Sequence, residues 1–336
     1  MNITISKAIE DYLETVRLSR SENTLRTYHN AMKSFSFVLE DNHLPSDKKL
    51  ISDLPVEAIS WFLVSLKHYA PATERLYLTA ITGFYEYLAA EELSESNLSR
   101  LRMLVRRRAR KLGQRLPQFP KSDIESIIEY AINIAHSSID ESSEHLRQLR
   151  DCAFLLTLAD TGLRVNEACN LRRGDLDWNE GKAIIIGKGN RQDIVRFSDR
   201  CMKYIKDYLS ARSKQDGASG RPLTALPLFA RHDRGAGRKI KPITTASGRN
   251  IVAQRVAEAL GAQAKGTITP HSFRHYFVTT VLNASGGNLK LAQELARHRN
   301  IAVTQRYAHL TDEELDRSYW EIFDSNQIHP YEPREK

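Results

Sequence analysis

The sequence predicts a mainly α-helical protein of two domains, an amino-terminal helical bundle and a mixed α+β domain with a small antiparallel sheet. Three observations support this fold class. The chain has 336 residues, which is about the length of two ordinary domains. Its apolar residues recur mostly at spacings of three and four, the period of an amphipathic helix. One stretch, residues 183–197, carries paired β-branched runs instead.

The amino-terminal domain is expected over residues 1–107 as a bundle of four or five helices. Ser21 can cap a helix whose apolar positions run from Leu25 to Leu39. A second helical pattern covers residues 56–69, and Pro71 suits the first turn of a third helix. These short amphipathic segments can bury one face each in a shared core.

The most polarised stretch lies between Ser96 and Gln118, where eight basic residues and no acidic residue occur. Two prolines near its end place an interdomain linker at residues 108–120. A basic linker can cross a nucleic-acid backbone, whereas the alternative is a solvated helix end that contacts nothing. The candidate DNA-binding residues are Arg106, Arg107, Arg108, Arg110 and Lys111.

The bulk composition limits the classes of function. Lys plus Arg number 49 against 41 for Asp plus Glu, a formal net charge of +8 that weakly favours a polyanionic partner. The sequence has no long apolar run and no signal segment at its start, so no membrane partner is expected. Three cysteines without a paired spacing indicate core residues in a reducing compartment. We therefore expect a cytoplasmic, nucleoid-associated protein, or a nuclear one in a eukaryote.

The second domain is expected over residues 121–336 as helices with one β-hairpin. Residues 183–186 and 193–197 flank Gly187–Asn190, a glycine-rich turn. The segment Asp216–Gly248, rich in Gly, Pro, Arg and Lys, predicts a long surface loop.

Two helices meet around Gly162. The helix over residues 151–160 ends there, and a second helix opens at Arg164. Arg164 and Glu167 are three residues apart and therefore share a face. This pair alone fits either an ordinary surface ion pair or part of a functional site.

Another group of polar residues lies at the start of a helix that Thr269 can cap, with Pro270 in its first position. His271 falls in the first turn, where free N–H groups favour an anion, and Arg274 and His275 share its face. A zinc site is the alternative for two histidines four apart, but Ser272 stands where a metalloprotease motif has glutamate. This polar face is too rich for a plain core helix.

Two further candidates follow near the carboxyl end. His298 lies at the end of a helix that Asn288 caps, and Tyr307 lies a few residues later. Taken separately, His298 fits a helix cap or an interdomain contact, and Tyr307 fits half-buried packing. Their occurrence with two arginines and another histidine changes the interpretation.

These residues together resemble the motifs of the tyrosine recombinase (phage integrase) family, which includes Xer-type recombinases, Cre and lambda integrase. The resemblance is strongest over residues 120–312, and the amino-terminal part is similar to the family's SAM-like core-binding domain only in length and pattern. Phe273 and Ala296–Arg297 depart from the leucine and Leu-Gly that the family often has. The matching blocks, in the family's order, are Thr161–Glu167, Gly187–Gly189, His271–His275, Ala296–His298 and Gln305–His309.

The resemblance implies that Arg164 and Arg274 hold a DNA phosphate, with His298 donating another hydrogen bond and Glu167 as a supporting carboxylate. Such a site meets a physical need, because the transition state of phosphodiester cleavage gathers negative charge. Guanidinium groups supply planar, permanently charged donors, and each well-placed donor stabilises the transition state by about 3 kcal/mol.

The resemblance also implies Tyr307 as the nucleophile, Lys188 as the acid that protonates the leaving oxygen, and His271 as an acid/base partner. The protein would then be a site-specific recombinase that forms a 3′-phosphotyrosyl intermediate, for integration, excision or resolution of DNA. Because the ester conserves the bond energy, rejoining needs no nucleotide cofactor and no metal.

The segment after Tyr307 carries a helical apolar stripe, Leu315 to Phe323, and predicts an exchange helix at residues 311–326. It can pack in its own domain or on a neighbour. The resemblance implies the second arrangement, a homo-tetramer on two duplexes with inverted-repeat core sites, from a protein that is monomeric or dimeric when free. The chain shows no obvious extra arm-binding domain at its start, which favours an Xer-like or Cre-like organisation.

Two other functions remain open at this stage. A type IB topoisomerase has the same Arg, Lys, Arg, His and Tyr set but relaxes supercoils without pairing sites. A non-catalytic DNA-binding protein could keep the basic surface without cutting, although no member of the implied catalytic set is missing.

Overall fold

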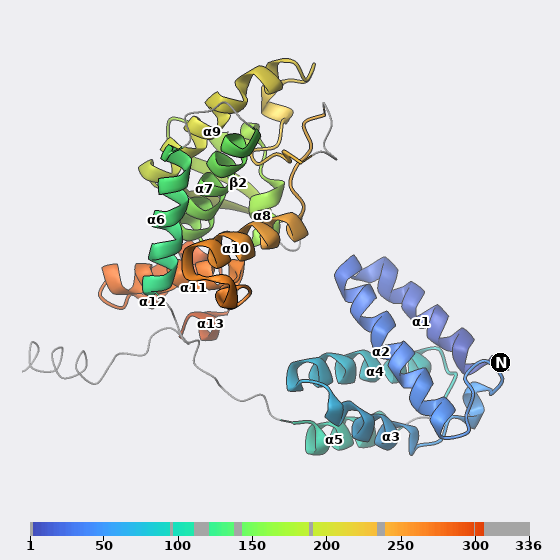
Figure 1. The fold of residues 1–336 in the computed structure, drawn as a ribbon. Coiled ribbons are helices and arrows are strands. Elements are labelled where there is room, and N and C mark those ends of the chain that lie inside the picture. Colours follow the sequence, from blue (N-terminus) through green and yellow to red (C-terminus); the bar gives the residue numbers. More distant parts are fainter. Residues whose placement is uncertain are drawn as a thin grey trace, which may run out of the picture. The chain divides into compact units, whose positions relative to one another are not determined.

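The chain divides into two compact units, residues 1–115 and 116–336, in a computed structural model (Figure 1). The structure describes residues 3–94, 97–110, 121–137, 143–187, 191–233, 239–298 and 300–305. Several sequence predictions fall outside the described residues. These are Lys111, most of the linker at 108–120, Lys188, Tyr307 and the exchange helix at 311–326.

The amino-terminal unit is helical, as the sequence predicted. Ser21 Oγ accepts a hydrogen bond from Thr24 N at the start of the second helix, and Pro71 occupies the first turn of the fourth. Rings from three helices, Phe35, Phe62 and Phe84, meet edge-on in the core. The helices are α1 (Ile5–Ser19), α2 (Glu22–Asp41), α3 (Ala58–Ser65), α4 (Pro71–Ala90) and α5 (Leu98–Arg108).

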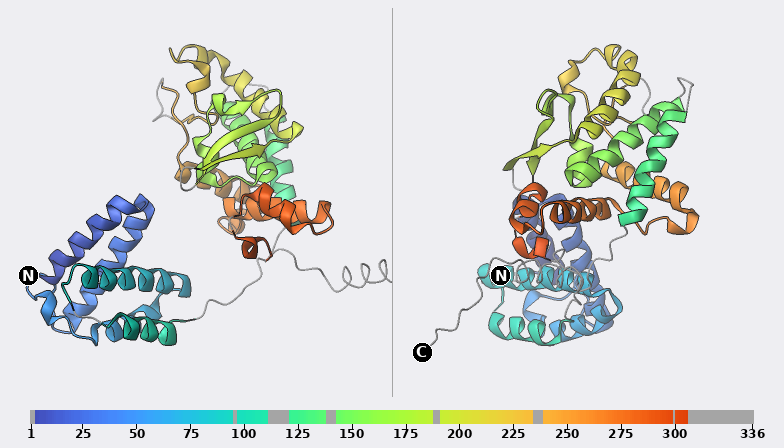
Figure 2. Two further views of the ribbon diagram at one scale, coloured as in Figure 1. Left: turned by 180° about the vertical axis from the view of Figure 1, so that it is seen from behind. Right: turned by 90° about the vertical axis from the view of Figure 1, so that its left-hand side faces the viewer.

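The second unit is built around one buried helix, α7. Its residues are buried without interruption from Leu149 to Ala159, and it packs against α6, α9 and α11 (Figure 1). Helix α8 also contacts it, and α11, α12 and α13 lie together at one end of the unit in both views of Figure 2. The helices are α6 (Lys121–Ser137), α7 (Ser143–Thr161), α8 (Val165–Asn170), α9 (Asp199–Gly217), α10 (Thr245–Leu260), α11 (Pro270–Ala284), α12 (Leu289–Ala296) and α13 (Ile301–Gln305).

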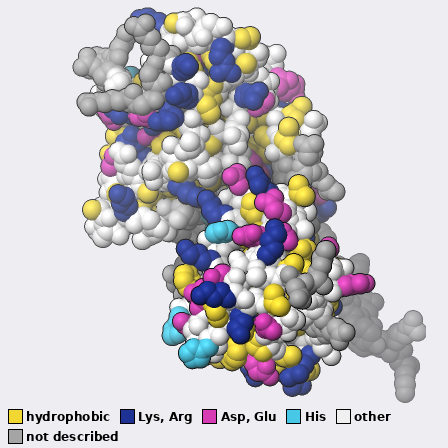
Figure 3. Space-filling model, turned by 90° about the vertical axis from the view of Figure 1, so that its right-hand side faces the viewer, with side chains coloured by type: hydrophobic (Ala, Val, Ile, Leu, Met, Phe, Trp, Pro, Cys, Tyr) yellow, Lys and Arg dark blue, Asp and Glu magenta, His cyan; other side chains and the backbone are white. Residues whose placement is uncertain are grey.

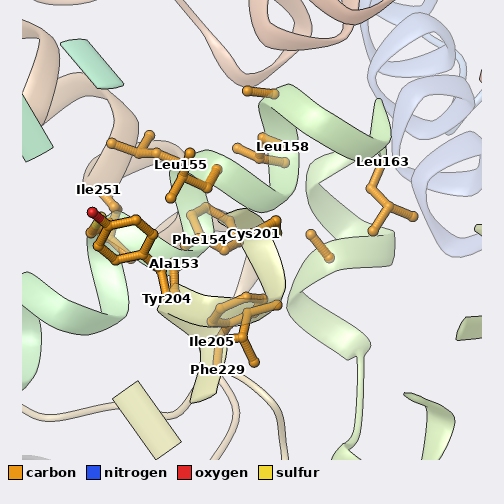
Figure 4. Packing of buried hydrophobic residues seen from close by; sticks show 14 of the residues in the cluster. Ala153, Phe154, Leu155, Leu158, Leu163, Cys201, Tyr204, Ile205, Phe229 and Ile251 are labelled. Atoms are coloured by element: carbon orange, nitrogen blue, oxygen red, sulfur yellow. The ribbon is translucent and has the colours of Figure 1, made fainter. Parts of the chain in front are cut away.

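The core of this unit joins segments that are far apart in the sequence. Phe154 of α7 meets Phe229 edge-on with ring centroids 5.2 Å apart, and Ile205 of α9 lies beside Phe229 (Figure 4). Ile251 of α10 belongs to the same buried cluster. The three cysteines are all free and buried, and Cys152 and Cys169 are core residues as expected. This packing fixes the ends of α7, one of which carries the candidate site.

The predicted hairpin is present and a short extra strand joins it. Strand β2 (Lys182–Gly187) pairs antiparallel with β3 (Arg191–Arg196) and with β1 (Leu176–Asp177), which the sequence reasoning missed. Ala183, Ile185 and Val195 face the core. The opposite face is apolar too, because Ile184 pairs with Ile194 there and both side chains are exposed.

The prediction of a surface loop over Asp216–Gly248 was wrong in part. Leu226, Leu228 and Phe229 are fully buried, and the buried Arg212 donates hydrogen bonds to the carbonyl oxygens of Pro227 and Leu228 at 2.8 and 3.0 Å. Helix α10 also begins inside the segment, at Thr245. These three apolar side chains anchor the segment in the core. The polar and glycine-rich composition of the segment as a whole did not indicate their burial.

None of the helices within the described ranges combines the length and the apolar character that crossing a membrane would require.

Candidate active site

Arg164 is placed by the sharp turn between α7 and α8. Gly162 ends α7 with a φ of +60°, and a Cβ at this position would overlap the ring of Phe277. Glycine is therefore required by both conformation and space. The chain then enters α8, with Arg164 at its N-cap and its side chain 51% exposed. The turn presents a guanidinium group to solvent from a rigid base.

Glu167 holds Arg164 in this place. Its Oε1 accepts a hydrogen bond from Arg164 Nη1 at 2.8 Å, and its Oε2 accepts one from the Arg164 backbone N–H at 2.9 Å. Burial by itself raises the pKa of this carboxyl, but the hydrogen bonds from Arg164 and the charge of Arg297 outweigh burial and lower the pKa below its usual value. Glu167 is thus a carboxylate at neutral pH and a partner of Arg164, as the sequence indicated.

Arg274 ties two distant turns together. It lies in α11, is only 3% exposed, and donates one hydrogen bond to Gly162 O at 2.5 Å and another to Ala296 O. Gly162 precedes Arg164 by two residues, and Ala296 precedes His298 by two. One guanidinium therefore holds the segments that carry two other candidates, although they are 134 residues apart in the sequence.

His271 and His275 lie one turn apart on α11, which begins at Pro270 after Thr269 as predicted. Their rings meet edge to face with centroids 4.3 Å apart. Burial, then Arg274 and Arg164, lower the pKa of His271, while burial, His271 and Arg274 lower that of His275 to about 4. Both rings are predominantly neutral at pH 7. The described residues hold no group of three or more His, Cys, Asp and Glu side chains placed to bind a metal ion.

His298 follows α12, which Asn288 caps by accepting a hydrogen bond from Leu291 N at 2.9 Å. Its Nδ1 lies 2.9 Å from Oγ1 of the buried Thr304 in α13. When Thr304 donates its hydroxyl proton to Nδ1, the neutral ring carries its proton on Nε2 and can donate it to another group. Burial, Arg274 and Arg164 lower the pKa of His298 to about 4.

Sequence reasoning missed one member of this cluster, Arg297. Its Nη2 lies 3.3 Å from Glu167 Oε2, on the side of the carboxylate away from Arg164 Nη1. The sequence signal was the departure at Ala296–Arg297, which appeared to concern only the subfamily. Its contact with Glu167 spans 130 residues, so no local pattern could reveal it.

The basic segment of the amino-terminal unit divides into two kinds of residue. Arg106, Arg107 and Arg108 are exposed in the last turn of α5. Arg110 instead donates its Nε–H to Oε2 of the buried Glu74 at 2.5 Å, so its charge is engaged inside the unit. Figure 3 shows basic side chains spread over the drawn face and mixed with acidic ones, so net charge alone does not outline a binding surface there.

The site as described brings together Arg164, Glu167, His271, Arg274 and His298. An exposed guanidinium, a second one behind it and neutral histidines suit the binding of an oxyanion such as a phosphate. An anion arriving there would raise the pKa of the histidines, because its charge opposes that of the arginines.

The chain resembles proteins of one family in sequence. A model described as the phage integrase family matches residues 119–314, more than half of the chain. The tyrosine recombinase XerC of Treponema denticola is 30% identical over 308 residues, covering 88% of this chain and 91% of the relative. The XerC of Pediococcus pentosaceus is 29% identical over 312 residues, covering 92% and 94%.

Solved structures share the fold. The XerH site-specific recombinase, in a post-cleavage complex with a palindromic difH substrate, matches with a TM-score of 0.66 at 18% identity, over 93% of this chain and 83% of that one. The Tn1549 transposon integrase in complex with transposon right end DNA matches with a TM-score of 0.64, also at 18% identity, over 96% and all of that chain. By its sequence and its fold, the chain belongs to the phage integrase family and is a tyrosine recombinase.

Proposed function

We propose that this tyrosine recombinase cleaves and rejoins double-stranded DNA at specific sites through a 3′-phosphotyrosyl intermediate. The observation that carries the proposal is the bridge made by Arg274, which holds the turns of Arg164 and His298 by their backbone carbonyls. The bridge supports a site in which three donors would reach one phosphate, from the N-cap of α8, from α11 and from the end of α12. Two findings support DNA as the partner. The sequence relatives are named as recombinases, and the structural neighbours were solved in complexes with DNA.

The proposed reaction begins with attack of Tyr307 Oη on the phosphorus of the scissile phosphate. The P–O5′ bond breaks, Lys188 gives a proton to the leaving 5′ oxygen, and the phenolic proton passes to a base. His271 is available as that base because its lowered pKa keeps it neutral at pH 7. Arg164, Arg274 and His298 stabilise the charge on the non-bridging oxygens. A deoxyribose hydroxyl then reverses the step on another strand, without metal or nucleotide.

Assembly is proposed on the same grounds. Four protomers would hold two duplexes, each with an inverted-repeat core site, and the helix at 311–326 would dock on the next protomer. Such a head-to-tail contact closes into a ring. Exposed Arg106, Arg107 and Arg108 would contact phosphates near the core site, with Lys111 beside them.

The test is covalent trapping on suicide DNA. A nicked duplex library, with randomised arms flanking the cleavage position, is incubated with the full chain, and adducts are recovered after denaturation. We expect an adduct with the wild-type chain, none with Tyr307→Phe, and an unchanged yield when EDTA is present. Tyr130→Phe, a change of the same kind on α6, is the matched control and should leave the yield unchanged.

Other outcomes would overturn parts of the proposal. No adduct from the wild-type chain would contradict cleavage, and an adduct that requires a metal would contradict the cofactor-free reaction. A strictly monomeric chain that relaxes plasmid of any sequence would instead indicate a type IB topoisomerase.

A further inference from the structure

Helix α12 ends at a residue that is left-handed but is not glycine. Arg297 has a φ of +56°, in the left-handed region that helices usually reserve for glycine at this position. A side chain in this conformation is unfavourable relative to glycine, because its Cβ lies too close to the backbone. Helix α7 ends in the same conformation with Gly162. Two other non-glycine residues that follow helix ends, His43 after α2 and Glu92 after α4, also have a positive φ. The conformation alone therefore assigns no use to Arg297, and its buried contacts carry the argument.

The side chain of Arg297 is buried as well. It is 6% exposed, and its Nε is buried without a hydrogen-bond partner among the described residues. Its contact with Leu295 O is long, at 3.5 Å. Taking a guanidinium out of water with incomplete hydrogen bonding is unfavourable. The ion pair with Glu167, 3.3 Å from Nη2, offsets this cost, and the charge of the nearby Asp193 also favours the charged form of Arg297.

Glu167 joins this buried arginine to an exposed one. Its side chain is 8% exposed, and it contacts Arg164 with both oxygens and Arg297 with one. The three groups carry two positive charges and one negative charge, which leaves a net charge of one positive unit. Without Arg297, the carboxylate would neutralise Arg164 and leave the pair with no net charge. The Glu167 carboxylate would also draw the Arg164 guanidinium away from solvent, because Arg164 would then be its only cationic partner among the described residues of this cluster.

We propose that Arg297 is a positioning residue that acts through Glu167: it compensates the carboxylate charge, so that Arg164 stays oriented and keeps a net positive charge toward the DNA phosphate. This inference rests on the proposed function of Arg164. It also assigns a role to the departure from glycine at this position. Arginine supplies a positive charge at this position, although the backbone conformation there favours glycine.

The expected effect falls on the chemical step. Arg297→Gly relieves the backbone strain and removes the compensating charge, so single-turnover cleavage at saturating DNA should fall by about tenfold to a hundredfold, the usual consequence of a misplaced catalytic group. DNA affinity should change far less, because Arg164 is one of many phosphate contacts. Arg297→Lys keeps the charge and should cleave faster than Arg297→Gly. Arg231→Gln, which removes an arginine paired with Asp233 elsewhere in the unit, should cleave like the wild-type chain.

A double-mutant cycle decides between this role and a structural one. In a Glu167→Gln background no carboxylate charge remains to be compensated, so adding Arg297→Gly should lower the cleavage rate by less than about threefold, as expected for residues that act as a unit. Thermal unfolding and circular dichroism confirm that each variant is folded, and Arg297→Asn, which also tolerates a positive φ, replaces Arg297→Gly if that variant is not.

The outcomes separate this inference from the proposed function. If the wild-type chain forms no covalent adduct, the proposed function fails. If the wild-type chain cleaves but Arg297→Gly cleaves equally fast, the inference fails alone. The inference also fails if Arg297→Gly lowers the cleavage rate as much in the Glu167→Gln background as in the wild-type background. A cleavage rate too low to detect in the double variant counts as such a loss.

Discussion

Asp151, Glu167 and Asp216 of the second unit are each held between two arginines, and the clusters of Asp151 and Glu167 differ in what solvent can reach. Asp151 lies between Arg150 and Arg255, at 2.6 and 2.8 Å, and all three side chains are at most 10% exposed. Glu167 lies between Arg164 and Arg297, but Arg164 is half exposed. The chemistry of the groups is the same and their access to an anion is not.

Charge balance follows the same division. Arg255 also contacts Glu258, so the buried cluster has two positive and two negative groups and no net charge. The Glu167 cluster has an excess positive charge directed to the surface. A neutral buried cluster can only contribute to the fold, whereas a charged cluster with one exposed member can bind an anion. Five predictions test this contrast, first at these two clusters and then at pairs of residues elsewhere in the chain.

The largest effect is expected from breaking the buried cluster. Asp151→Asn leaves two buried arginines without their shared carboxylate, which typically costs about 3–5 kcal/mol of unfolding free energy. Urea denaturation of the full chain should show this as a lower midpoint for the second unit. The folded fraction should still cleave DNA at the wild-type rate. A loss below about 1 kcal/mol would contradict a structural role for the cluster.

The opposite pattern is expected at the exposed cluster. Arg164→Ala should lower single-turnover cleavage by about a hundredfold to a thousandfold, as when one preorganised donor to the transition state is removed. Unfolding free energy should change by less than about 1 kcal/mol, because Arg164 is half exposed and the buried Glu167 keeps Arg297 as a partner. Arg164→Lys should recover only part of the rate, since it keeps the charge and loses the two-pronged geometry. An unaffected rate would remove Arg164 from the active site.

The amino-terminal unit offers the same contrast on a smaller scale. Arg110→Ala should lower the stability of that unit by about 1–3 kcal/mol, because the buried Glu74 loses its closest partner. Arg107→Ala should leave stability unchanged and reduce the slope of log affinity against log salt by about 1. Fluorescence anisotropy at several salt concentrations measures the slope. Equal slopes for Arg107→Ala and the wild-type chain would remove Arg107 from the DNA contacts.

The smallest expected effect concerns pH. Burial and nearby arginines lower the pKa of His298 to about 4 and that of His232 to about 3, from 6.5. The unfolded chain therefore binds more protons than the folded one below pH 6.5, so stability is fully present above that pH and falls as the pH is lowered toward 5. Unfolding midpoints at pH 7.5 and 5 check the direction.

The two histidines should differ when DNA is added. A bound phosphate should raise the pKa of His298, which lies among the phosphate-binding candidates, and leave that of His232 unchanged, because its ring contacts the buried Tyr208 hydroxyl at 2.8 Å. Proton NMR of the histidine rings, with and without DNA, measures both values. Parallel shifts of the two rings would contradict the placement of the anion beside His298.

Local chemistry explains what the sequence could predict. The helix starts at Ser21, Pro71 and Thr269 follow from capping groups and prolines within a few residues, and the hairpin follows from alternating β-branched residues. The contact of Arg164 with Glu167 follows from helical spacing. In each case the interacting groups are near in sequence, so pattern and physics coincide.

What the sequence could not predict depends on the tertiary structure. Strand β1 has two residues and exists only because β2 lies beside it. Phe229 is buried by a core that forms elsewhere, and Arg297 meets Glu167 only after α12 packs near α8. The burial of Arg274 was also hidden, because its motif indicated a phosphate contact and not the two backbone carbonyls it holds.

The bridge made by Arg274 bears on the choice of an inactive variant for trapping complexes with DNA. Arg274 holds two turns from the interior, so replacing it would also loosen those turns. The inactivity of an Arg274 variant could then result either from the loss of a hydrogen-bond donor to the phosphate or from displacement of the two turns. Tyr307→Phe removes a single oxygen atom and leaves both fastenings intact. For crystallisation or cryo-microscopy of an uncleaved assembly, the conservative change at the nucleophile is therefore the sounder choice, and defects of Arg274 variants should be interpreted as architectural as well as chemical.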